Sequence, residues 1–325
     1  MARRLNFSGY DGSRPVAIPD VPAPLRGAGK AHSLALILEI ALDHCGLTLG
    51  YDAIMGLCEL AFRTPPWPRS PEADEDDATA AVSALSDALG GCMTVAGHDE
   101  SDEDAILRAV ATAVDAGRPC AAFGWGSEKE RWSVIAGYDR GKGRLLGHCL
   151  LDAPRMQYES WPPALRMLVA ITSDPEPRGP RAVDDALQSG AARVVGEGAE
   201  RLAAWVSEMR LIDGPPGPSH ERAVELLADA RAAAAGFAER VAAYQGEIAA
   251  AWLARAAERW RELVMLLEAR GLPHSREAAE ALEEPQGRAD WAELLESAAR
   301  LDDAAATAVR ASTSADYPPE EARSW

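Results

Sequence analysis

Apolar residues recur three or four positions apart in the first third of the chain, a spacing typical of amphipathic helices. The segment 32–45 shows this spacing most clearly, and it predicts a helix that ends at Gly46. Further helices are expected over 51–61, 78–89 and 99–117. Acidic residues open the last two, where the helix dipole favours negative charge. The chain therefore begins with helices.

The middle of the chain carries short apolar runs separated by glycine-bearing turns, a pattern typical of strands. Strands that follow one another so closely favour an antiparallel sheet. Helices that precede a group of strands favour an α+β fold over a repeating βαβ fold. The strands are expected within 92–97, 119–125, 131–139, 143–151 and 167–171.

One packing contact follows from these two patterns. The apolar stripe of the helix over 33–45 is expected to lie against the strand over 132–138. Successive side chains of a strand point to opposite faces, so Trp132, Val134 and Ala136 are expected to share one face.

From residue 180 onward the chain is rich in alanine and predicts helices without strands. The proline-rich segment 213–219 breaks the pattern, and Gly236 and Gly246 are positions where a long helix could bend or divide. Tryptophans on the apolar positions, Trp205, Trp252 and Trp260, are expected to be largely buried. The helices are expected over 182–188, 198–209, 220–270 and 275–310.

These patterns divide the chain into four parts. Residues 1–30, rich in proline and glycine, form either an extended arm on the fold or a loose tail. Residues 31–175 form an α+β domain, and residues 180–310 form an α-helical domain. Residues 311–325 are expected to be a disordered tail.

The charge balance narrows the range of partners. The chain has 33 Lys and Arg against 51 Asp and Glu, a formal net charge of −18. This balance argues against nucleic acid or an anionic membrane surface as a partner. The apolar run 34–42 is too short to span a bilayer, and the N-terminal residues lack the apolar stretch of a secretory signal, so we expect a cytoplasmic protein. The alanine-rich helices are expected to pack on the first domain or to form a homodimer.

Familiar site motifs do not occur in the sequence. The five cysteines form no CxxC pair, and the six histidines lack the spacing of metal ligands. The sequence has no GxSxG, Walker or HExxH motif. We therefore expect neither a metal nor a cofactor, and we interpret the cysteines as small buried apolar residues.

The helix over 32–45 nevertheless carries a pattern with a possible chemical meaning. It begins at Ser33, has Ile37 about one turn later, and is closed by Gly46. This arrangement resembles the start of papain-like cysteine hydrolases of the bacteriocin-processing type and of the butirosin acyltransferase N-terminal domain. In that family the first helical turn carries the nucleophilic Cys, because a helix N-terminus stabilises a thiolate and an oxyanion.

A second segment supports the same resemblance, which covers roughly residues 25–175. The segment 131–139 ends in Gly-Tyr-Asp, and in the family the catalytic His begins the strand that ends in this turn. The His position falls at Arg131 or Trp132 here, and the third catalytic position falls at Asp152. Since Ser33 replaces the Cys and neither Arg nor Trp can act as its base, the resemblance implies a catalytically inactive protein.

Several functions remain open at this level. The former catalytic cleft could bind a small molecule or a peptide through Ser33, Trp125, Arg131 and Trp132, or the protein could act as a partner subunit. An active hydrolase or acyltransferase with a relocated Cys or Ser is the second hypothesis, and a helical scaffold is the third. Each candidate also has a structural interpretation: Ser33 as a helix cap, Arg131 as a solvated turn residue, and Trp125, Trp132 and Trp161 as core residues.

Overall fold

The computed structural model divides the chain into two compact units. It describes residues 15–25, 29–67, 75–97, 103–127, 129–150, 157–160, 165–269 and 276–314. The sheet unit comprises Met1–Leu49 and Glu75–Pro177, and the helical unit comprises Gly50–Asp74 and Arg178–Trp325. The sequence-based division kept residues 50–74 with the sheet, whereas the structure assigns them to the helical unit.

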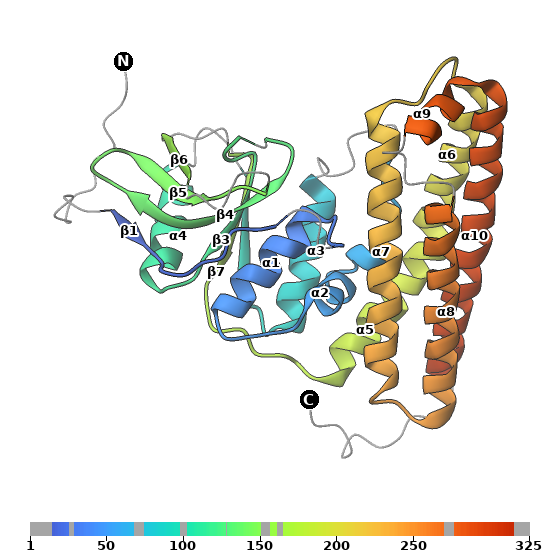
Figure 1. Cartoon of the computed structure of the whole chain (residues 1–325). Coiled ribbons are helices and arrows are strands. Elements are labelled where there is room, and N and C mark those ends of the chain that lie inside the picture. The colour runs from blue at the N-terminus through green and yellow to red at the C-terminus, as the bar shows by residue number, and fades with distance from the viewer. Residues whose placement is uncertain are drawn as a thin grey trace. The chain divides into compact units, whose positions relative to one another are not determined.

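The sheet unit contains one antiparallel sheet, so the chain has an α+β fold (Figure 1). Its main strand order is β2-β7-β3-β4-β5-β6, and β1 pairs with β4. The five strands expected from the sequence are present, while β1 and β6 were not anticipated. The strands are β1 (Val16–Ala17), β2 (Met93–Gly97), β3 (Cys120–Phe123), β4 (Trp132–Asp139), β5 (Arg144–His148), β6 (Gln157–Ser160) and β7 (Met167–Ile171).

Part of the N-terminal arm belongs to this sheet. Val16 pairs with Tyr138 and Ala17 with Gly137, so β1 continues the edge of β4 along which β3 has already paired. Gly137 permits this close approach, because a Cβ there would lie only 2.5 Å from the carbonyl oxygen of Val16. Of the two possibilities for the arm, its described residues 15–25 take the extended path on the fold.

Three helices, α1 (Ser33–His44), α3 (Glu75–Ala88) and α4 (Glu103–Asp115), accompany the sheet. Helix α1 contacts β3 and β4, helix α4 contacts β4 and β7, and helix α3 contacts β2. Every residue of β4 is buried, so the centre of the sheet is covered on both faces. The contact predicted between the helix over 33–45 and the strand over 132–138 is confirmed, because the apolar stripe of α1 is buried and α1 packs on β4.

The end of α1 shows why its sequence signal was clear. Gly46 has φ +85°, the left-handed conformation that glycine adopts without strain. Its N–H donates to the carbonyl of Asp43 at 2.9 Å, and the N–H of Leu47 donates to Leu42 at 3.0 Å. These two bonds form a Schellman motif that satisfies the last carbonyls of the helix.

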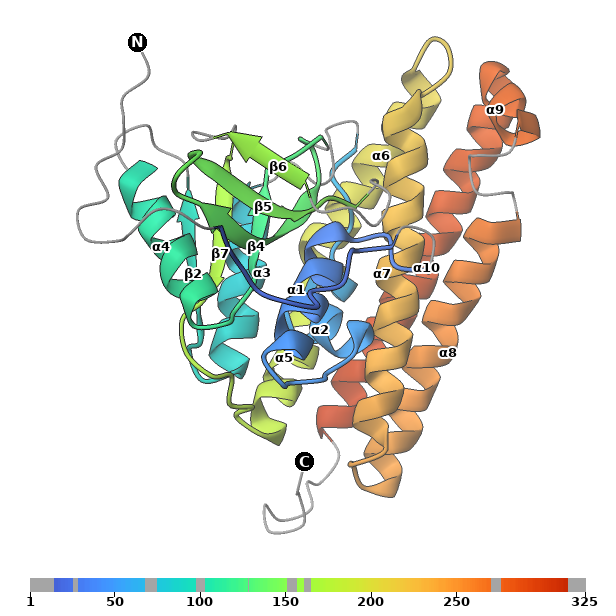
Figure 2. The same ribbon diagram turned by 60° about the vertical axis from the view of Figure 1, so that its left-hand side comes forward.

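The helical unit contains no strand among its described residues, as the sequence predicted. Helices α6, α7, α8 and α10 make its largest contacts and run alongside one another (Figure 2). The short helices α2 and η1 pack on α5 and α7. The helices are α2 (Tyr51–Leu57), η1 (Leu60–Phe62), α5 (Pro180–Arg193), η3 (Val194–Gly198), α6 (Ala199–Leu211), α7 (Pro218–Ala242), α8 (Glu247–Ala269), α9 (Arg276–Glu283) and α10 (Pro285–Ser314).

Two helix boundaries expected from the sequence need correction. The helices expected over 182–188 and 198–209 are longer and are joined by the π-helical turn η3, because packing overrides the low helix propensity of its glycines. The stretch 220–270 divides before Gly246 into α7 and α8, at one of the two positions that the sequence indicated, while α7 continues through Gly236.

At the C-terminal end, α10 continues to Ser314, so residues 311–314 are helical rather than part of a disordered tail. Residues 315–325 lie outside the described residues. Trp205 and Trp260 are fully buried as expected. Trp252 is partly exposed, and the guanidinium of Arg255 lies 5.6 Å from its ring centroid.

A buried ion pair connects two helices in the core of the helical unit. Arg231 of α7 forms two bonds to Asp302 of α10, at 2.6 Å and 2.5 Å, and both side chains are almost completely buried. Trp260 of α8 adds a 3.0 Å bond from its indole Nε1 to Asp302. This network fixes the register of three helices, because each donor faces one carboxylate.

Candidate functional site

The structure brings together the two positions that the papain-like resemblance assigns to nucleophile and base. Ser33 is the first residue of α1, after His32 at the N-cap position, and its side chain is fully buried. Its Oγ accepts a hydrogen bond of 3.1 Å from the main-chain N–H of Trp132, the first residue of β4. This hydrogen bond connects the first residue of α1 to the first residue of β4.

Neither polar group of Trp132 can serve as a base for Ser33. A serine hydroxyl needs a neighbouring base to become a strong nucleophile, and an amide N–H or an indole cannot take its proton. The Trp132 ring is itself part of the core, with its centroid 5.4 Å from that of Phe123 at an interplanar angle of 35°. The guanidinium of Arg166 lies 4.3 Å from the Phe123 ring centroid.

A second group of polar atoms gathers around Trp125, between β3 and β4. The carbonyl of Trp125 accepts bonds from Ser133 Oγ at 3.5 Å and from Cys149 Sγ at 3.8 Å. The Trp125 side chain is fully buried, and its indole Nε1 has no hydrogen-bond partner within the described parts of the chain. His148 is buried and pairs in register with Val134. Trp125 therefore belongs to the core and keeps one unused donor.

The remaining predicted residues are placed less centrally. Arg131 is half-buried in the turn that precedes β4. Asp152, the candidate third member, and Trp161, a candidate groove residue, lie outside the described residues. The structure therefore unites Ser33 with Trp132 and keeps Arg131 next to them along the chain.

The thiols give little support to a relocated nucleophile. Burial raises the pKa of Cys58 and of Cys120 to about 12. Burial also raises the pKa of Cys45 and of Cys92, although the nearby Arg118 acts in the opposite direction. A reactive cysteine requires a lowered pKa, because the thiolate is the attacking form. These four thiols are accordingly suited to packing.

Across the described residues, no group of three His, Cys, Asp or Glu side chains is arranged to hold a metal ion. Within those residues, too, no helix is both long and apolar enough to cross a membrane.

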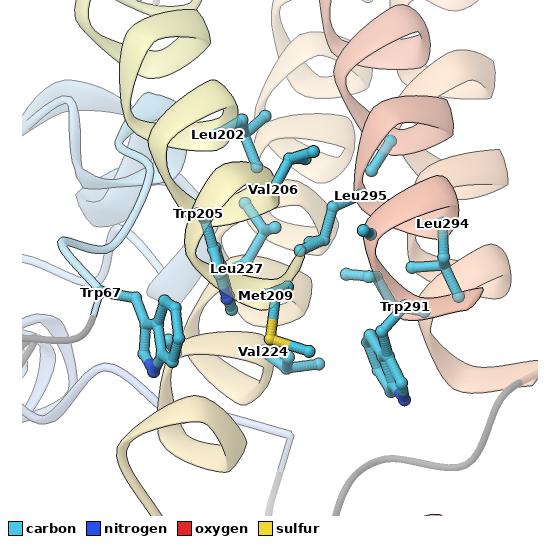
Figure 3. Close-up of a cluster of buried hydrophobic side chains, with 14 of the residues drawn as sticks. Trp67, Leu202, Trp205, Val206, Met209, Val224, Leu227, Trp291, Leu294 and Leu295 are labelled. Carbon is cyan, nitrogen blue, oxygen red and sulfur yellow. The ribbon is translucent and has the colours of Figure 1, made fainter. Parts of the chain in front are cut away.

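The structure reveals one polar site that sequence reasoning missed. In the helical unit, His220 of α7 is fully buried, and three indole rings surround it. Trp67, Trp205 and Trp291 come from three separate segments, and Figure 3 shows them within one apolar cluster. Positions 67, 205, 220 and 291 follow no local period, so only folding could bring them together. We call these four residues the tryptophan–histidine cluster.

Comparison with known proteins gives no functional assignment for this chain. No family model and no curated protein matches the chain.

Proposed function

We propose that this chain is a catalytically inactive protein of the papain-like type that acts by binding. The bond from the Trp132 main-chain N–H to Ser33 Oγ carries the proposal. It joins the two positions at which a papain-like enzyme holds its nucleophile and its base, and a Trp at the second position cannot act as the base that Ser33 would need. A helix that begins beside the first residue of a core strand is the arrangement that the resemblance implies.

Two hydrogen-bond donors, the indole N–H of Trp125 and the guanidinium of Arg131, indicate the class of ligand. Trp125 has a buried indole N–H without an acceptor among the described residues, and buried polar groups normally have one. Arg131, half-buried beside Trp132, is suited to a carboxylate. A peptide segment or a small molecule that carries carbonyl or carboxylate oxygens would satisfy both groups.

Two experiments test this proposal. Labelling of the folded full-length protein with a fluorophosphonate and with iodoacetamide should be slow and unselective, because the proposed site lacks a base that would activate Ser33. A thermal-shift screen with short peptides and small dicarboxylates should find a ligand that raises the melting temperature, since binding to the native state stabilises it.

Matched variants test whether the ligand binds through Trp125 and Arg131. Trp125→Phe and Arg131→Gln should each abolish the ligand-induced shift, whereas Trp252→Phe in the helical unit should retain it. Fast labelling of one Ser or Cys would instead support a hydrolase or acyltransferase. A protein that neither labels nor responds to any ligand would support the scaffold hypothesis. The homodimer prediction is tested separately, by sedimentation equilibrium of the full chain.

A further inference from the structure

His220 lies where four segments of the helical unit meet. It is the third residue of α7, and Trp205 lies on α6 while Trp291 lies on α10. Trp67 belongs to the segment that follows η1. The ring centroid of His220 is 5.9 Å from Trp67, 5.5 Å from Trp205 and 5.1 Å from Trp291, and each pair is edge-to-face.

One hydrogen bond fixes the protonation state of this histidine. The indole Nε1 of Trp205 donates to Nδ1 of His220 at 3.2 Å, so Nδ1 must carry a lone pair. The proton of the neutral ring therefore sits on Nε2, which is buried and has no partner among the described residues. A second proton on Nδ1 would place two N–H donors against each other and break the bond to Trp205.

The surroundings offer little compensation for a positive charge. The cluster around His220 is apolar, and burial alone lowers its pKa from 6.5 to about 4. Indole faces attract cations, but this attraction would replace neither the lost hydrogen bond nor the hydration of the ring. Charged residues close in sequence to the cluster include Arg63 and Arg288, which are buried, and Glu208, Glu221, Arg222, Asp290 and Glu293, which are exposed or half-buried.

We propose that the tryptophan–histidine cluster is an acid-sensitive latch, in which protonation of His220 releases the start of α7 from Trp67, Trp205 and Trp291. The latch is closed when the ring is neutral and opens when Nδ1 gains a proton. Opening would separate α7 from α6 and α10 at this end of the helical unit and expose the indole rings shown in Figure 3.

The direction of the pH dependence follows from linkage. The closed cluster holds His220 neutral down to about pH 4, whereas an opened, hydrated histidine binds its proton near pH 6.5. The open state therefore binds more protons between these values, and falling pH favours opening. Stability of the closed state is complete above pH 6.5 and is lost progressively as the pH falls from 6.5 to 4.

Hydrogen exchange of the full-length protein measures this opening directly. Amides in the first turns of α7 and in α6 should open about a hundredfold more readily at pH 4.5 than at pH 7.5, after correction for intrinsic exchange rates. His220→Gln and His220→Phe should remove the pH dependence, while His44→Gln in the sheet unit should leave it unchanged. A pH-independent wild type, or an unchanged dependence in both His220 variants, would overturn the proposal.

A measurement on the unaltered protein guards against variants that fail to fold. An NMR titration of the His220 ring should show Nδ1 without a proton and Nε2 with one, and an apparent pKa well below 6. A ring that titrates near 6.5 in the folded chain would overturn the latch. This proposal does not depend on the proposed function, because His220 belongs to the helical unit.

Discussion

The main-chain N–H of Trp132 donates a hydrogen bond to the side chain of Ser33, a residue 99 positions earlier in the chain. The bond joins the first turn of α1 to the first residue of β4 inside the core of the sheet unit. It gives Ser33 a structural task that is independent of any ligand, and it leads to the first prediction.

Replacing Ser33 with Ala should destabilise the sheet unit. The substitution leaves the buried N–H of Trp132 without its acceptor, and such a loss costs about 1–3 kcal/mol. Urea unfolding followed by circular dichroism measures the change. Ser83→Ala, at an exposed position of α3, is the control and should alter the free energy of unfolding by less than about 0.5 kcal/mol. Equal effects of the two substitutions would show that the Ser33 bond contributes nothing.

The native protein should show no turnover of activated esters or peptides, and Ser33→Cys should not create it. A new thiol at this position would lie beside Trp132, and neither Trp132 nor Arg131 can accept its proton. Loss of a general base alone lowers rates by about 10²–10⁴-fold. The assay compares the native protein with Ser33→Ala and Ser33→Cys. Native turnover that disappears in Ser33→Ala would contradict the inactive assignment.

The buried pair Arg231–Asp302 should be far more sensitive to substitution than an exposed pair. Asp302→Asn leaves the Arg231 charge uncompensated in the core, which costs about 3–5 kcal/mol. The comparison is Glu262→Gln, which removes one of two carboxylates that pair with the partly exposed Arg259 of α8 and should cost less than about 1 kcal/mol. Chemical denaturation of each variant gives both values, and similar losses would show that the buried network adds no special stability.

Two glycines in helical segments should respond oppositely to alanine. A Cβ at Gly56 in α2 would lie 2.2 Å from the buried ring of Phe237, so Gly56→Ala should destabilise by about 1–3 kcal/mol. A Cβ at Gly196 in η3 would meet nothing within 4 Å, so Gly196→Ala should be neutral or stabilising by up to about 1 kcal/mol. The melting temperatures of the two variants measure these changes in stability. A decrease of similar size in both would contradict the argument that only the Cβ at position 56 clashes.

The sequence by itself determined the elements whose signals are local. The helix α1 could be predicted because its apolar spacing and the left-handed Gly46 lie within one short segment. The strands β3, β4 and β5 could be predicted because glycine-bearing turns bound short apolar runs. Helical spacing indicated buried positions for three tryptophans, of which Trp205 and Trp260 are fully buried and Trp252 is partly exposed.

Tertiary structure decided what depends on contacts between distant segments. Strand β1 has only two residues, and it exists as a strand because β4 offers an unpaired edge beyond β3. Residues 50–74 joined the helical unit because α2 and η1 bury their apolar residues on α5 and α7, a preference that no local pattern encodes. The surroundings of His220 likewise arise from three indoles that lie far apart in the sequence. Spacing along a chain reports which face of an element is apolar, but not which partner will cover that face.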